Sequence, residues 1–120
     1  MRKPYTVRHI DEVEGVACLC GSSRRVLTAV DTPTASLHLV DIKKDSEVHY
    51  HKSHWELYYI LRGQGTMTLD GDVVPIRAGH AIGIPPGVRH RARGDLQLIN
   101  VVIPAFDPED EYVVAGEDQP

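Results

Sequence analysis

Residues 49–65, HYHKSHWELYYILRGQG, are the stretch from which the fold of this chain can be read. Three histidines and a glutamate (His49, His51, His54 and Glu56) come first, and a run rich in aromatic and aliphatic residues follows. Such a run favours a β-strand over a helix. Side chains at positions i and i+2 of a strand share one face, so His49 and His51 are expected to project together. A turn at residues 52–53 brings Glu56 back to the point at which His49 and His51 are aimed. His54 is predicted to lie in that turn, either exposed to solvent or behind these three side chains.

A second stretch, residues 79–90 with the sequence GHAIGIPPGVRH, ends on His90. We expect His90 to reach the same centre from a distant strand end. Three imidazoles and one carboxylate suit a divalent borderline metal such as Fe, Mn, Co, Ni or Zn. Such a set also leaves a coordination position for water or substrate. The sequence therefore predicts one divalent transition metal held by His49, His51, Glu56 and His90.

The rest of the chain reads as short strands separated by turn signals. No segment has a convincing helical period, and glycines at positions 63, 65 and 94 are expected to break strands. This pattern predicts an all-β sandwich or barrel. The expected strands cover residues 16–20, 24–30, 35–42, 48–51, 55–61, 66–69, 73–76, 81–84, 90–93 and 96–103.

The length of 120 residues suits a single domain. We divide it into N-terminal strands and an arm at residues 1–34, a barrel core at 35–103 and an acidic extension at 104–120. The net charge of −4 argues against nucleic-acid and anionic-membrane surfaces as partners, because both require clustered positive charge. No signal-peptide or membrane-spanning pattern is found, so we expect a cytoplasmic protein. Cys18 and Cys20 are predicted to be two buried free thiols, since a bridge across one residue of an extended strand would be strained.

The two stretches resemble the paired motifs of the cupins. In the first motif, His-x-His is followed after four residues by Glu56 and after six more by Gly63. In the second motif, Gly79, Pro85, Gly87 and His90 stand at the family's spacing. Lys43 and Gly94 depart from the pattern at turn positions, where the family has glycine and asparagine. The resemblance covers about residues 35–103 and implies a jelly-roll barrel, the double-stranded β-helix, with the four metal ligands named above.

The resemblance leaves the reaction open among three classes. The first is a metal-dependent oxygenase or dioxygenase acting on a small organic substrate. The second is an isomerase, epimerase or lyase with a non-redox metal; a sugar-phosphate substrate would need a cation at the barrel mouth, for which Lys52 is a candidate. The third is a non-catalytic module that binds a small molecule.

Two further residues are candidates for the catalytic machinery. Tyr58 should share the inward face of Glu56, where it serves either as a proton donor or substrate contact or as part of the packed core. His38 lies one strand earlier and points either into the barrel or to the surface. Strands 57–61 and 96–103 carry more apolar residues than one buried face needs, so we also expect a homodimer.

Overall fold

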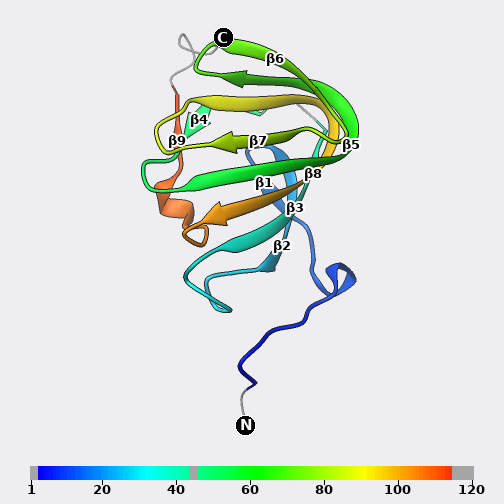
Figure 1. Ribbon diagram of the computed structural model, residues 1–120, viewed down its shortest axis with the longest axis vertical. Helices are drawn as coiled ribbons and strands as arrows, with labels where there is room; N and C mark the ends of the chain where they lie inside the picture. Colours follow the sequence, from blue (N-terminus) through cyan, green and yellow to red (C-terminus); the bar gives the residue numbers. More distant parts are fainter. Residues whose placement is uncertain (1–2, 44–45, 115–120) are drawn as a thin grey trace.

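The computed structural model describes residues 3–43 and 46–114, and shows a strongly curved β-sheet that closes into a barrel (Figure 1). Among these residues, nine strands belong to one sheet with the order β1-β2-β3-β8-β4-β9, while β5 pairs with β6, β7 and β8. Every strand pair is antiparallel. The prediction of an all-β jelly-roll barrel is confirmed.

Only two single helical turns of the 3-10 type, η1 (Ile10–Glu12) and η2 (Pro108–Asp110), interrupt the strands of the described chain. The strands are β1 (Val16–Cys18), β2 (Gly21–Leu27), β3 (Ser36–Ile42), β4 (His49–Tyr50), β5 (Trp55–Leu69), β6 (Asp72–Arg77), β7 (Ala81–Ile84), β8 (His90–Ile103) and β9 (Tyr112–Val113).

Strands β5 and β8 are the two long ribbons of the barrel, and they pair along almost their whole length. The predicted breaks at Gly63, Gly65 and Gly94 are wrong, because both strands bend at these glycines and continue. Gly63 and Gly94 have φ angles of 93° and 119°, which only glycine adopts readily. A Cβ atom at Gly63 would collide with the carbonyl oxygen of Asp95 on the neighbouring strand. The glycines therefore let one strand serve both halves of the barrel.

The inward-facing rows of three strands change from apolar to polar along the barrel. Ile42, Ile60 and Leu98 are almost fully buried and belong to the hydrophobic core. At the other end of the same rows most inward residues are polar, and the pairing of neighbouring strands places them side by side, as with His38 and Asn100. These polar inward residues are Ser36 and His38 on β3, Glu56 on β5 and Asn100 on β8. The site is thus built at one end of the barrel, on rigid strands.

The two ends of the described chain behave differently. Residues 3–9 extend away from the barrel as an arm, seen in blue in Figure 1. The C-terminal segment instead returns to the barrel, where β9 pairs with β4 and Val113 lies opposite His49. The arm is joined to the barrel through Arg8, whose guanidinium lies 3.0 Å from a carboxylate oxygen of Asp31. Among the described residues, no helix has the length and apolar character that crossing a membrane would require.

Candidate metal centre

The four predicted ligands come together from three strands and the loop after β4. His49 lies on β4 and is paired in register with His90, the first residue of β8. His51 follows β4 directly, and Glu56 is the second residue of β5. All four side chains are buried, with exposed fractions between 1% and 6%. The period of two that predicts His49 and His51 on one face matches their positions in the structure.

The ligand atoms converge on one point. One ligand atom from each of His49, His51 and Glu56 can be chosen so that all lie within 4.8 Å of one another. Oxygen Oε1 of Glu56 lies 2.9 Å from Nε2 of His90 and 3.1 Å from Nδ1 of His51. A separation of this size is what ligands of one small ion require.

The donor atoms fit a bound cation, because several of them have no other partner. Nε2 of His51, Oε1 of Glu56 and Nε2 of His90 are buried and make no hydrogen bond of good geometry with the described residues. A buried polar atom left unsatisfied costs about 1–3 kcal/mol. A divalent cation bound by these atoms would remove that cost, and a set of imidazole and carboxylate donors suits Fe, Mn, Co, Ni or Zn.

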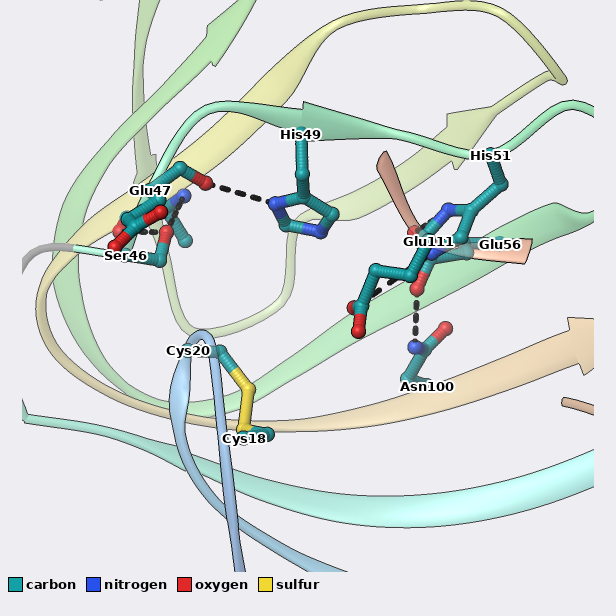
Figure 2. The surroundings of a disulfide bond; sticks show 10 residues. Cys18, Cys20, Ser46, Glu47, His49, His51, Glu56, Asn100 and Glu111 are labelled. Atoms are coloured by element: carbon teal, nitrogen blue, oxygen red, sulfur yellow. Dashed lines mark hydrogen bonds and ion pairs between the residues drawn. A yellow bond between two sulfur atoms is a disulfide. The ribbon is translucent and has the colours of Figure 1, made fainter. Parts of the chain in front are cut away.

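Contacts behind the ligands hold them in orientation. Nδ1 of His49 donates to the carbonyl of Glu47 at 2.8 Å, and Nδ1 of His90 donates to the carbonyl of Val88 at 2.9 Å. Each imidazole therefore carries its proton on Nδ1 and presents the lone pair of Nε2 to the centre. Figure 2 shows the His49 contact and the amide of Asn100, which donates to Oε2 of Glu56 at 2.6 Å.

Electrostatics keep the ligands in different protonation states. Burial disfavours the charge on Glu56, but His51 and His90 outweigh it and hold its pKa well below the usual range. Burial and the neighbouring His90 lower the pKa of His49 to about 4. Burial acts in the same direction on His51, but Glu111 and Glu56 outweigh it and raise its pKa to about 9. An ionised Glu56 and a neutral His49 are the forms that bind metal.

The two candidate catalytic residues both face the interior. Tyr58 is buried two residues after Glu56, and burial raises the pKa of its hydroxyl well above the usual value. His38 is also buried and lines the cavity, which decides between the two orientations left open by the sequence. Burial and the charge of Arg25 lower the pKa of His38 to about 4. Their catalytic roles stay predictions.

The cavity beside the cluster has a volume of about 60 Å³. A site of this measure holds about four to six waters, since each needs roughly 10–15 Å³. It is suited to a small organic molecule. Its walls combine the histidine–glutamate cluster with Tyr58, and with residues from β2, β3, β8 and the C-terminal segment, namely Ser23, Arg25, His38, Asn100, Phe106 and Glu111.

Two residues of the site were not identified from the sequence. Asn100 matches no motif, although it interrupts the apolar inward row of Leu96, Leu98 and Val102, and this interruption is a usable signal. Glu111 lies in the segment predicted as an acidic extension, and its carboxylate stands 3.8 Å from Nε2 of His51 (Figure 2). No sequence signal points to Glu111, because its position depends on how the C-terminal segment folds back.

Of the two positions left open for His54, exposed or behind the ligands, the structure shows the second, since its side chain is only 3% exposed and its ring lies 5.5 Å from that of His51. The C-terminal segment covers it: Nε2 of His54 accepts a hydrogen bond from the backbone of Asp107 at 3.3 Å, and Nδ1 lies 3.4 Å from Asp110. Asp110 also accepts hydrogen bonds from the backbone N–H groups of Lys52 and Ser53, both at 2.9 Å. One carboxylate thus fixes the turn between the ligands His51 and Glu56.

The prediction of two free thiols is also wrong, because Cys18 and Cys20 form a disulfide (Figure 2). The strand expected over residues 16–20 ends at Cys18, and Leu19 and Cys20 form a turn. This turn shortens the Cα–Cα distance to 5.2 Å, within the range that a disulfide spans. Both cysteines line the cavity, so the β1–β2 turn forms part of its wall.

A buried cluster of imidazoles and a carboxylate inside an antiparallel barrel defines a class of β-barrel proteins with a candidate metal site. Within that class, the sequence profile of the cupin domain matches residues 37–102, more than half of the chain. The chain belongs to the cupin family.

Three comparisons show the range of proteins to which the chain is similar. A solved structure of a protein from Planctomyces limnophilus has 38% identity and a TM-score of 0.85, covering 89% of this chain and 95% of that one. Quercetin 2,3-dioxygenase of Bacillus subtilis is 34% identical over 64 residues, which are 50% of this chain and 19% of that protein. Pac13 of Streptomyces, a nucleoside dehydratase, has a TM-score of 0.81 at 22% identity, with 96% and 98% coverage, and is similar in fold.

Proposed function

We propose that this cupin is a metal-dependent enzyme of the oxygenase type that acts on a small organic substrate bound in the barrel cavity. The observation that carries the proposal is the buried cluster beside a cavity of about 60 Å³, in which His51 Nε2, Glu56 Oε1 and His90 Nε2 converge and make no hydrogen bond of good geometry with the described residues. The local similarity to quercetin 2,3-dioxygenase supports the oxygenase class.

In this proposal His49, His51, Glu56 and His90 hold one divalent transition metal. When bound, the metal supplies an electrophilic centre and, if it is iron or manganese, a one-electron redox couple. The residues of the chain bind and orient the substrate around it. Tyr58 keeps its proton at neutral pH, because its pKa is raised, and it can donate a hydrogen bond to a substrate oxygen. Asn100 holds the second oxygen of Glu56, so the carboxylate keeps one orientation.

Lyase or isomerase chemistry is the second candidate, and Glu111 is the observation that favours it. Its carboxylate lies in the cavity wall, 3.8 Å from His51, and can take or deliver a proton without redox chemistry. The similarity in fold to a nucleoside dehydratase agrees with this candidate. Lys52, the candidate phosphate contact, instead lies over the ring of Tyr112 at 4.4 Å and does not line the cavity among the residues described.

The test begins with elemental analysis of protein purified without added metal and without a histidine tag. Protein loaded with Fe(II) or Mn(II) is then given flavonols, catechols and small hydroxy acids, with oxygen consumption as the readout. Oxygen uptake that is lost in Glu56→Gln supports the oxygenase proposal. Product formation without oxygen, sensitive to Glu111→Gln, supports the lyase or isomerase candidate. Tight binding without any turnover contradicts both and indicates a binding module.

We also propose that two copies associate through the outward face of β5. Four large apolar side chains alternate along this face and are 41–50% exposed, namely Trp55, Leu57, Tyr59 and Leu61. Ile103 of β8 lies beside Trp55 in register and extends the same surface. A contiguous apolar face on a sheet is typical of an interface between subunits.

A further inference from the structure

The cavity has a second chemical end, apart from the cluster of histidines and glutamate. Arg25 of β2 and His38 of β3 are paired in register and both line the cavity. Phe106 lies against both side chains, with its ring 5.2 Å from the guanidinium carbon of Arg25 and 5.7 Å from the ring of His38. The metal cluster does not use any of these three residues. They form a separate wall of the cavity, to which β2, β3 and the C-terminal segment each contribute one residue.

Arg25 places a positive charge at this wall. Its side chain is accessible, and no carboxylate of the described residues forms an ion pair with it. Its charge reaches the cavity, because it contributes to the lowered pKa of His38. The guanidinium carries five N–H donors, and no hydrogen bond among the described residues uses one of them. Arg25 is therefore a cation with unused donors beside the cavity.

His38 adds a directed donor. Oγ of Ser36 accepts a hydrogen bond from the backbone N–H of Phe106 at 2.8 Å and lies 2.8 Å from Nε2 of His38. If Ser36 accepted from His38 as well, its own buried hydroxyl proton would have no acceptor among the described residues. The arrangement that satisfies every group has Ser36 donating to Nε2. Neutral His38 then carries its proton on Nδ1, for which no described residue is an acceptor.

We propose that Arg25 and His38 form an anion subsite that binds the carboxylate of a small organic acid, with the other end of that acid at the His49–His51–Glu56 cluster. The proposal deepens the proposed function and rests on it for the metal end. A guanidinium binds a carboxylate through two parallel hydrogen bonds, and the Nδ1–H of His38 supplies a further donor. One cation and about 60 Å³ suit a single carboxylate better than a phosphate, which carries more charge and needs more donors.

The charge pattern of the cavity also gives the acid one direction. With a divalent cation bound, the carboxylates of Glu56 and Glu111 leave the cluster end close to neutral, whereas Arg25 makes the β2 end positive. A monocarboxylate is therefore expected to place its charge at Arg25 and a metal-binding oxygen at the cluster. A dicarboxylate needs a bound cation at the cluster for its second carboxylate.

The experiment titrates malonate into the full chain loaded with Zn(II), which supports no redox turnover, and follows binding by calorimetry. We expect malonate to bind, neutral malonamide not to bind, and oxalate, malonate and succinate to differ because the two ends are fixed. Arg25→Gln should weaken malonate binding about tenfold or more, the range for a hydrogen bond to a charged group. Arg24→Gln is the matched control, since Arg24 directly precedes Arg25 on β2 and does not line the cavity.

The outcomes separate this proposal from the proposed function. If zinc binds at one equivalent and Arg25→Gln binds malonate as tightly as the wild type does, the subsite is refuted and the metal site stands. Equal binding of malonamide has the same meaning. If zinc does not bind, the proposed function fails, and acetate titration of the metal-free chain by NMR tests the subsite alone. Acetate-dependent shifts of the His38 ring signals that vanish in Arg25→Gln support the subsite, and their absence in the wild type refutes it.

Discussion

The hydrogen bond from Asn100 to Glu56 leads to the most direct prediction about the metal centre. Nδ2 of Asn100 lies 2.6 Å from Oε2 of Glu56, and both side chains are buried. A hydrogen bond to a charged group contributes about 1.5–3 kcal/mol. Loss of this contact frees the Glu56 carboxylate to rotate. Since 1.4 kcal/mol corresponds to a factor of ten, Asn100→Leu should lower metal affinity about 10- to 100-fold.

The effect on folding should be smaller than the effect on metal affinity. Oδ1 of Asn100 is itself buried without a hydrogen-bond partner among the described residues. Leucine removes this unsatisfied acceptor, which offsets part of the lost hydrogen bond. The free energy of unfolding of the metal-free protein is therefore expected to change by less than about 2 kcal/mol. Asn100→Asp keeps the shape of the side chain but replaces the donor with an acceptor, and it should weaken metal binding as well.

The assay is competition for zinc against a chromophoric chelator, combined with denaturant unfolding of the metal-free protein. Gln97→Leu is the matched control: Gln97 also lies on β8 and donates an amide hydrogen bond to a carboxylate, that of Asp41 at 3.2 Å, away from the cluster. Its metal affinity should equal that of the wild type. Unchanged zinc affinity in Asn100→Leu would refute the reasoning, and so would an equal loss in Gln97→Leu.

Three further predictions concern other parts of the fold. Asp110→Ala removes the acceptor for two backbone N–H groups of the turn between the ligands, so the amides of Lys52 and Ser53 should exchange with deuterium at least about tenfold faster. The hydrogen bond from Arg8 lowers the pKa of Asp31 to about 2, so this pair stabilises the fold fully above about pH 4, and its contribution disappears as the pH falls through 2. In Asp31→Asn, the free energy of unfolding measured by circular dichroism should therefore fall less steeply between about pH 4 and pH 2. Leu57→Arg places a charge in the apolar face of β5 and should convert a dimer into a monomer in sedimentation velocity.

Each of these predictions has a control variant at an exposed residue. Glu109→Ala changes an exposed acid of η2, and the turn amides should keep their protection. Asp72→Asn changes an exposed carboxylate of β6, and the fall in the free energy of unfolding with pH should keep its slope. Arg62→Ala changes an exposed residue near the end of the apolar face, and association should persist. A wild-type chain that sediments only as a monomer contradicts the proposed dimer.

The C-terminal segment illustrates what sequence reasoning could not provide. An acidic terminus is most often solvated, and no pattern distinguishes Asp110 or Glu111 from other surface acids. In the structure, Asp110 bonds to backbone groups 57 and 58 positions earlier. Such contacts depend on the curvature of the whole sheet, which lets the C-terminal segment bring η2 beside the β4–β5 turn. The burial of His54 follows from contacts with the same segment, which is why the sequence left its exposure open.

The sequence by itself indicated an all-β chain and the pairing of His49 with His51 on one face, because the period of a strand is a local property, and its two motifs pointed to the cupin family. Only the tertiary structure decided what surrounds those ligands. Asn100 reaches Glu56 across 44 positions of sequence, and Arg25 meets His38 through the register of two strands. Register and curvature are set by packing of the whole sheet, and at Gly63 and Gly94 they turned predicted breaks into bends. The identities of the ligands are therefore local information, and the shape and charge of the cavity are not.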